Sequence, residues 1–325
     1  MLNDERLERI VQEKAGGCLQ FRQKVCIQES HRSSVYRCIF SDGNAEDCTF
    51  ILKVYTESTH EALLYAYLHT RRYLDGVLLD CGEENDRPYI LMHDLAKTHQ
   101  SLCDWQPPIS QEQQGRLLMQ IAHFHTANRA DYADLRRQIG LPWHLQSVKQ
   151  YREHLGYLRR DFDRFQEHPP FLLSPDQLQC YEEALNFLEK DTPFLFEHLH
   201  QNDIFTFIHG DLNVGNVYYP LAPEGAVVFL DYEAIRVGLF GEDLVMLLVH
   251  DLYHGAEETR RMFGRYYQCL PDGIRQRLTP ALFEHCTRHV LSEGLFFPMK
   301  LFAHYGVNDE ALVRKSLDAF EQLVH

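Results

Sequence analysis

The sequence predicts an α+β protein in which a small, β-rich N-terminal part precedes a larger, mainly α-helical part. Up to residue 95, short runs rich in β-branched and aromatic residues alternate with turn signals, which is typical of antiparallel strands. From residue 96 onward, apolar residues mostly recur at helical spacing, apart from one β-like interruption at 204–231. We therefore expect two domains, at residues 1–95 and 96–325.

The N-terminal part is predicted to be a small antiparallel sheet with one inserted helix. Strands are predicted over residues 20–28, 34–40, 49–55, 77–83 and 88–95. The Asp, Gly and Asn residues of 41–47 favour a hairpin turn. A short helix over 4–14 precedes the strands, and a helix over 58–70, with Ser58 or Thr59 as its cap, follows the third strand.

The C-terminal part is predicted to be helical on both sides of its β-like interruption. Ser110 stands at a cap position, and Thr279-Pro280 is a start signal because proline is favoured at the first helical position. Helices are predicted over residues 110–130, 145–168, 175–200, 242–254, 256–269, 279–304 and 308–324. The interruption itself ends in a predicted hairpin, NVYYP followed by AVVFLDYE.

Composition restricts the partners that the chain can have. Its net charge of −15 argues against nucleic acid, which is bound by basic patches. A cationic substrate is compatible with this charge, and so is plain solubility. There is no apolar run long enough to span a membrane, and the nine cysteines contain no C-x-x-C pair. We expect a cytoplasmic protein with free thiols that binds neither nucleic acid nor membranes; the oligomeric state is not indicated.

The β-like interruption carries the most informative motif, IFTFIHGDLNVGNVYYP at 204–220. It places His209, Asp211 and Asn216 in the order H-x-D-x-x-x-x-N, and the hairpin that follows ends at Asp231. Mg²⁺ takes carboxylate and amide oxygens together with phosphate oxygens. Phosphoryl transfer needs such a metal and an acidic side chain that orients the attacking hydroxyl. It also needs a cation on the phosphates, and Lys53 lies in an apolar predicted strand, FILKVY.

The motifs HGDLNVGN, LDYE and ILKVY together resemble the aminoglycoside phosphotransferase and choline kinase branch of the protein-kinase-like superfamily. They are similar to that family's catalytic loop, metal-binding segment and lysine strand, respectively. The segment 231–248 also resembles the family, with Gly238, Gly241 and Asp243 in place. The resemblance covers roughly residues 20–300 and implies a bilobal protein-kinase-like fold with a nucleotide-binding N-lobe and a helical C-lobe.

The resemblance also implies roles for individual residues. Asp211 would be the catalytic base, and Asn216 and Asp231 would bind Mg²⁺. Lys53 would bind the α and β phosphates of ATP, with Glu61 as its partner. In the predicted hinge at residues 92–95, the His93 carbonyl and the Leu95 amide would face adenine. His209 would brace the catalytic loop, and Asp243 would anchor its backbone.

The stretch that would contact phosphate departs from the family, because QESHRSSVYRCIF at 28–40 contains no glycine. Ser33 and Ser34 are candidate phosphate ligands through hydroxyl and amide groups, and Arg32 can add charge. Ordinary structural roles stand beside these assignments. Asp211, Asn216 and the two serines are also typical turn residues, and Glu61 and Asp243 are also typical acids of a helix N-terminus. Glu233 can reach substrate or a second metal, or simply be solvated.

The predicted substrate is a small molecule with a hydroxyl group. Helical residues begin near Glu242, so soon after Asp231 that no activation segment for a peptide fits, and Asn213 stands where protein kinases carry a lysine. The acidic C-terminal helices suit an amine-bearing alcohol or an aminosugar, whereas Arg159-Arg160 suits an anionic one. The alternatives are a nucleotide-binding pseudokinase or regulatory protein and, with less support, a protein kinase or a nucleotidyl transferase on the same fold.

Overall fold

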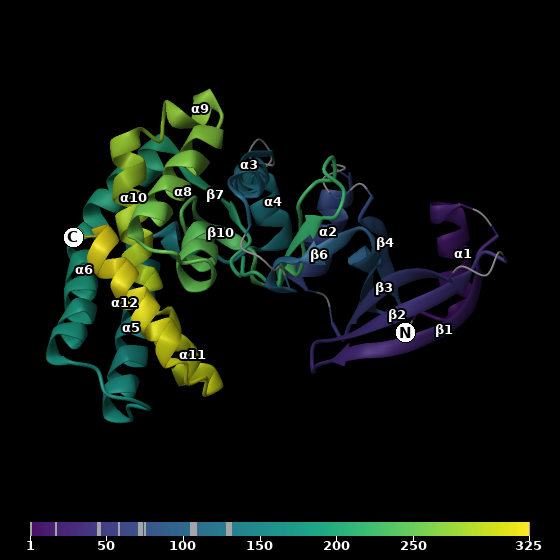
Figure 1. Ribbon diagram of the computed structural model, residues 1–325, viewed down its shortest axis with the longest axis horizontal. Coiled ribbons are helices and arrows are strands. Elements are labelled where there is room, and N and C mark those ends of the chain that lie inside the picture. The colour runs from purple at the N-terminus through teal and green to yellow at the C-terminus, as the bar shows by residue number, and fades with distance from the viewer. Residues whose placement is uncertain are drawn as a thin grey trace. The chain divides into compact units, whose positions relative to one another are not determined.

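The computed structural model describes residues 2–16, 18–43, 47–57, 59–70, 74, 76–104, 109–127 and 132–324 (Figure 1). The predicted cap Ser58, residues 44–46 of the predicted turn and the end of the predicted helix 110–130 lie outside these ranges. The chain divides into two compact units. The N-terminal unit comprises residues 1–100, 218–225 and 231–233, and the C-terminal unit comprises 101–217, 226–230 and 234–325.

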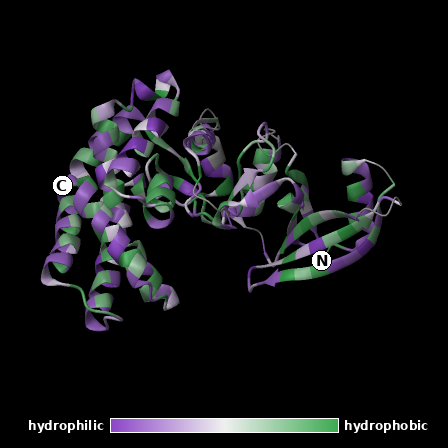
Figure 2. Ribbon diagram, viewed as in Figure 1, coloured by the Kyte–Doolittle hydropathy of each residue, from purple (hydrophilic) through white to green (hydrophobic). Residues whose placement is uncertain are grey.

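The N-terminal unit is built on a five-stranded antiparallel sheet with the strand order β1-β2-β3-β5-β4. Its strands are β1 (Gln20–Glu29), β2 (Ser33–Ser41), β3 (Asp47–Tyr55), β4 (Leu78–Glu84) and β5 (Arg87–His93). In β3 buried residues alternate with less buried ones toward its C-terminal end, as expected for a sheet with one face on the core. Hydrophobic and hydrophilic residues both occur along the strands of this sheet (Figure 2). Phe40 and Phe50 pack edge to face there, with ring centroids 5.4 Å apart. The predicted small antiparallel sheet is therefore confirmed.

Two helices accompany this sheet. Helix α1 (Asp4–Ala15) starts at Asn3, whose side chain accepts a hydrogen bond from the Arg6 amide, and it buries Leu7 and Val11. Helix α2 (His60–Thr70) starts at Thr59, whose hydroxyl accepts from the Ala62 amide at 3.2 Å. Of the two predicted caps, Thr59 therefore holds the helix that carries Glu61.

Short elements lie where the chain passes from one unit to the other. They are η1 (Leu95–Lys97), β6 (His99–Ser101), η2 (Leu102–Asp104), β8 (Val217–Pro220), β9 (Val228–Phe229) and η5 (Tyr232–Ala234). The predicted hairpin is present in β8 and β9, since the Leu230 amide just after β9 donates to the Asn216 carbonyl just before β8 at 3.0 Å.

The C-terminal unit is mainly helical (Figure 1). Its helices are α3 (Gln111–Ala127), α4 (Tyr132–Ile139), η4 (His144–Gln146), α5 (Val148–Glu167), α6 (Pro175–Asn202), α7 (Glu242–Leu244), the π-helix η6 (Val245–Asp251), α8 (Ala256–Cys269), α9 (Asp272–Arg275), α10 (Pro280–Gly294), α11 (Phe297–Tyr305) and α12 (Glu310–Val324). Strands β7 (Phe205–Ile208) and β10 (Arg236–Leu239) pair antiparallel beside the 209–216 loop.

Two predicted helices differ from the structure. The helix predicted over 279–304 is divided into α10 and α11, because Pro298 lacks an amide hydrogen and favours a new helix start. The helix predicted over 242–254 is one short α-helical segment followed by a π-helix that ends at Asp251. Both differences lie in apolar segments where the spacing of buried residues alone gives no sign of a break.

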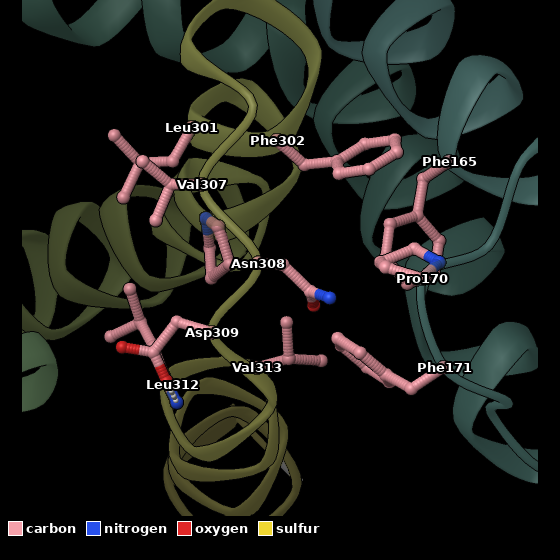
Figure 3. A pocket seen from close by; sticks show the side chains of 11 residues that line it. Phe165, Pro170, Phe171, Leu301, Phe302, Val307, Asn308, Asp309, Leu312 and Val313 are labelled. Atoms are coloured by element: carbon pink, nitrogen blue, oxygen red, sulfur yellow. Dashed lines mark hydrogen bonds between the residues drawn. The ribbon is translucent and has the colours of Figure 1, made fainter.

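The connection between α11 and α12 packs near the C-terminal end of α5 (Figure 3). Phe165, Phe171 and Phe302 line an apolar cavity there of about 10 Å³. Such a volume holds about one water molecule at most, so this corner is packing and not a ligand site. None of the described helices combines the length and the apolar character that crossing a membrane requires.

Candidate functional site

In the N-terminal unit, three charged residues form a lysine cluster: Lys53, Glu61 and Asp231. Strand β3 carries Lys53 opposite Val35 and Ile90, and α2 carries Glu61 in its first turn. The Lys53 Nζ lies 2.8 Å from Glu61 Oε2 and 2.9 Å from Asp231 Oδ1. Glu61 is 1% exposed, Lys53 is 13% exposed and Asp231 is 49% exposed. The predicted contact between Lys53 and Glu61 is confirmed.

The electrostatics of this cluster keep Lys53 charged. Burial acts to lower the pKa of Lys53, but the charges of Glu61 and Asp231 outweigh it, so the pKa lies above its ordinary value. Burial raises the pKa of Glu61 above its ordinary value, and the Lys53 ammonium opposes that rise. The result is a fixed cation beside one buried and one accessible carboxylate.

Asp231 is held in an unusual backbone conformation. Its φ is +66°, in the left-handed region that non-glycine residues rarely adopt. Its amide faces the Tyr65 hydroxyl at 3.4 Å, and Tyr65 packs edge to face on Tyr232 with ring centroids 5.4 Å apart. Such strain persists only where the surroundings hold it, and it is concentrated at functional positions.

The turn between β1 and β2 explains how this segment folds without glycine. The Ser30 hydroxyl accepts hydrogen bonds from the amides of Arg32 (3.2 Å) and Ser33 (3.0 Å), so a serine side chain closes the turn. The Ser33 amide is therefore engaged within the turn. Ser33 and Ser34 open strand β2, and Arg32 contacts the carboxylate of Glu233.

The predicted hinge segment at residues 92–95 is held by hydrogen bonds and an ion pair, some of them to other strands of the sheet. The His93 amide donates a hydrogen bond to the Val77 carbonyl at 2.9 Å. Asp94 caps η1 by accepting from the Ala96 amide, and it pairs with Arg37 at 2.9 Å. Leu95 is buried as the first residue of η1. Burial lowers the pKa of His93.

In the C-terminal unit, the 209–216 loop is anchored by Asp243 of α7. The Asp243 carboxylate accepts hydrogen bonds from the amides of His209 (2.7 Å) and Gly210 (2.9 Å) and contacts His125 Nε2 at 3.0 Å. Burial acts to raise the pKa of Asp243, but hydrogen bonding from His125 and the charge of His125 outweigh it, so the pKa is lowered. The predicted anchoring role of Asp243 is confirmed, and His125 is its buried partner.

A second anchor, Asp251, was not predicted from the sequence. Its Oδ2 accepts a hydrogen bond from the Val214 amide at 2.7 Å, and it is the last residue of the π-helix. Burial raises the pKa of Asp251 above its ordinary value. The available signal was another acid on the helical segment that begins at Glu242, but the direction of the Asp251 side chain depends on the π-helical geometry, which the sequence does not indicate.

Inside the loop, Asn216 is held against Asp211. The Asn216 Nδ2 donates to the Asp211 carbonyl at 2.8 Å and lies 3.3 Å from Asp211 Oδ2. This places the nitrogen toward Asp211 and leaves the amide oxygen on the other side. His209 Nε2 lies 2.9 Å from the carbonyl of Leu230, the residue before Asp231. This contact joins the loop to the end of the hairpin that follows it, which supports the predicted bracing role of His209.

Gly210 is required at its position in the loop. Its φ is +81°, and a Cβ there would lie 2.1 Å from the carbonyl oxygen of Ala234. Arg236 of β10 donates to the Gly210 carbonyl at 3.1 Å and pairs with Glu242 at 2.9 Å. The backbone on either side of Asp211 is thus held from several directions, so the Asp211 carboxylate is presented on a rigid loop.

Each unit offers one oxygen donor of the kind that a hard divalent cation takes. Asp231 offers an accessible carboxylate, one oxygen of which accepts a hydrogen bond from the Lys53 ammonium. Asn216 offers an amide oxygen. Carboxylate and amide oxygens are the donor set that Mg²⁺ prefers.

Comparisons with known proteins agree with this description. The model of the phosphotransferase enzyme family matches residues 27–279. No curated protein matches the chain significantly in sequence. Among solved structures, the GDP complex of aminoglycoside 2′-phosphotransferase-IIIa is 13% identical, covers 99% of both chains and gives a TM-score of 0.51.

Two further structures show the same likeness. Ethanolamine kinase from Plasmodium vivax is 11% identical over 99% of this chain and 90% of that one, with a TM-score of 0.51. Macrolide 2′-phosphotransferase from Brachybacterium faecium is 18% identical over 95% of this chain and 96% of that one, with a TM-score of 0.53. At these identities the likeness shows the fold alone, and the predicted protein-kinase-like fold is confirmed.

Proposed function

The chain belongs to the phosphotransferase enzyme family, and we propose that it transfers the γ-phosphate of ATP to a hydroxyl of a small molecule. The acceptor classes that we propose are aminoglycosides, aminosugars, amino alcohols and sugars. Three neighbours of similar fold are named as kinases or phosphotransferases of an aminoglycoside, ethanolamine and a macrolide, which supports acceptors of this kind. We place the protein in the cytoplasm, where ATP is abundant.

The observation that carries this proposal is the doubly anchored 209–216 loop. Asp243 holds the amides of His209 and Gly210 at its start, and Asp251 holds the Val214 amide farther along. Asp211 lies between these anchored amides, and Asn216 donates to its carbonyl. A carboxylate that is held this firmly can orient an acceptor hydroxyl and accept its proton as the oxygen attacks the γ-phosphorus. The bond from the γ-phosphorus to the bridging oxygen breaks, and ADP leaves.

The lysine cluster has a complementary role in the proposal. Lys53 binds the α and β phosphates, and Glu61 holds the ammonium in place. Asp231 beside Lys53 and Asn216 in the loop would each offer an oxygen donor to Mg²⁺, which would supply positive charge that neutralises the phosphates. Ser33 and Ser34 contact phosphate through their hydroxyls, and the His93 carbonyl and Leu95 amide contact the base.

The test is phosphoryl transfer followed by mass spectrometry. The protein is incubated with MgATP and a pooled panel of amino alcohols, aminoglycosides and sugars, beside the Asp211→Asn variant. We expect an acceptor product heavier by one phosphoryl group, which the variant fails to form. MgATP binding without ATP consumption would favour a pseudokinase, a reading that the glycine-free β1–β2 turn keeps open. A product that carries AMP would identify a nucleotidyl transferase.

A further inference from the structure

A second hollow lies in the C-terminal unit, apart from every residue assigned above. Its volume is about 490 Å³, and residues of α8, α10 and the end of α12 line it. This volume is within the range of about 300–1,000 Å³ that is typical of small-molecule sites. Phe263, Phe283 and Leu291 are buried side chains that form its apolar wall.

One glycine lies beside this hollow. Gly264 lies in the middle of α8 and lines the cavity, and a Cβ at that position would meet no atom within 4 Å. A glycine inside a helix costs about 1 kcal/mol relative to alanine. Neither a close contact nor a positive φ requires a glycine at this position, and the space beside the Gly264 Cα is part of the hollow.

The rim of the hollow carries two arginines. Arg260 of α8 donates to the Gln322 carbonyl, and Arg288 of α10 lies with its guanidinium carbon 4.5 Å from the ring centroid of Phe187. Neither forms an ion pair with a carboxylate among the described residues. An arginine stacked on an aromatic ring keeps its N–H groups in the plane for an anion.

The other polar residues of the rim do not cancel this charge. Glu284 also lines the hollow, so Arg260, Arg288 and Glu284 together leave one net positive charge. His285 lines it as well and is held from behind by Asp191, with 2.7 Å between Nε2 and Oδ1. In a chain with a net charge of −15, a cationic rim above an apolar wall is unusual.

We propose that this hollow binds a small amphipathic anion. The apolar body of the ligand packs against Phe263, Phe283 and Leu291. Its carboxylate, sulfonate or phosphate group accepts hydrogen bonds from Arg288 and Arg260. The proposal is independent of the phosphotransfer reaction, because none of the residues that line the hollow belongs to the lysine cluster or to the 209–216 loop.

Two fluorescent probes test the proposal on the full-length folded protein. Anilinonaphthalene sulfonate has an apolar body and one negative charge, and N-phenyl-1-naphthylamine has the same body without the charge. We expect one anilinonaphthalene sulfonate molecule to bind per chain, about tenfold more tightly than the uncharged probe, since tenfold corresponds to one good charged contact.

Substitution of Gly264 locates the site. Gly264→Phe fills the hollow, and we expect it to abolish binding of both probes. Gly264→Ala is the matched control, because a methyl group meets no atom there; we expect unchanged binding and a raised melting temperature. Undiminished probe binding by a folded Gly264→Phe variant would overturn the proposal.

Substitution of the rim tests the charge. Arg288→Gln is expected to weaken anilinonaphthalene sulfonate about tenfold and to leave N-phenyl-1-naphthylamine unchanged. Glu284→Gln is expected to tighten the charged probe alone. These exposed positions leave the fold intact, so melting temperatures should match the parent protein. Equal affinity of the two probes in all variants would contradict the anionic specificity.

Discussion

The lysine cluster and the 209–216 loop hold their key residues by different physical means. In the cluster, side chains bind side chains: one ammonium lies between two carboxylates. In the loop, carboxylates bind backbone amides, two at Asp243 and one at Asp251. The first arrangement sets charge and tolerates small movements of its members. The second sets the path of the chain, and a change in either anchor alters the shape of the whole loop.

The largest effect should come from the residue that the loop presents. Asp211→Asn is expected to lower kcat by about 10²–10⁴-fold, because a general base contributes about that much. The anchors of the loop are unchanged, so its melting temperature should stay close to that of the parent protein. Single-turnover kinetics and thermal unfolding measure the two quantities. A variant with full activity would show that Asp211 is not the base.

The next largest effect should come from the main anchor. Asp243→Asn removes a buried charge that holds two amides and His125, and it is expected to lower the free energy of unfolding by about 3 kcal/mol. Asp251→Asn is the matched comparison. It affects a single amide and should cost about 1.5 kcal/mol. Denaturant titration measures both, and equal losses would mean that the two anchors share the loop evenly.

A third prediction concerns how the stability of the C-terminal unit depends on pH. His289 is buried between Asp191 and Glu293; burial acts to lower its pKa, but hydrogen bonds to these carboxylates raise it to about 9. Its stabilising contribution is therefore complete below the unfolded pKa near 6.5 and is lost as pH rises through about 9. The loss amounts to about 3 kcal/mol as an upper figure.

Urea titration of the full-length protein between pH 6 and 10 measures this loss. Hydrogen exchange over the same pH range reports the stability of the C-terminal unit. His289→Gln serves as the control and should flatten the pH dependence in that range. A parent protein whose stability rises with pH over this window would contradict the assignment of a charged His289.

The smallest effect should come from the lysine cluster. Glu61→Gln removes a buried carboxylate whose pKa burial raises, while Asp231 still faces Lys53. We expect little change in unfolding free energy and about a tenfold rise in the KM for ATP, since Lys53 loses one charged contact. Steady-state kinetics with ATP as the varied substrate test it. A large loss of stability would mean that the cluster, like the loop, serves mainly as scaffold.

The comparison also shows what the sequence could and could not predict. Lys53, Asp211 and Asn216 are predicted from their motifs, and the resemblance to a known family adds Glu61 as the partner of Lys53. The contacts of Lys53 with Glu61 and of Asp243 with the loop amides agree with the expectation. The sheet was predictable because β-branched and aromatic residues alternate between turn signals.

Three features of the fold were not predicted, because each depends on small energy differences that the local sequence pattern does not show. The π-helix that directs Asp251 differs from an α-helix by a small balance of hydrogen bonding and packing. The closure of the β1–β2 turn by Ser30 depends on one hydroxyl rotamer. The division of α10 from α11 had a signal in Pro298, which the helical spacing of the surrounding residues outweighed.

The anchoring of the loop also has a consequence in time. The amides of His209, Gly210 and Val214 donate hydrogen bonds to carboxylates that lie 33 to 37 residues later in the chain. During synthesis, which proceeds from the N-terminus, the loop is made before either carboxylate. Buried amides without partners are costly, so the loop takes its working shape only after α7 and η6 have been made. A nascent chain therefore carries the lysine cluster's Lys53 and Glu61 well before it carries an ordered 209–216 loop.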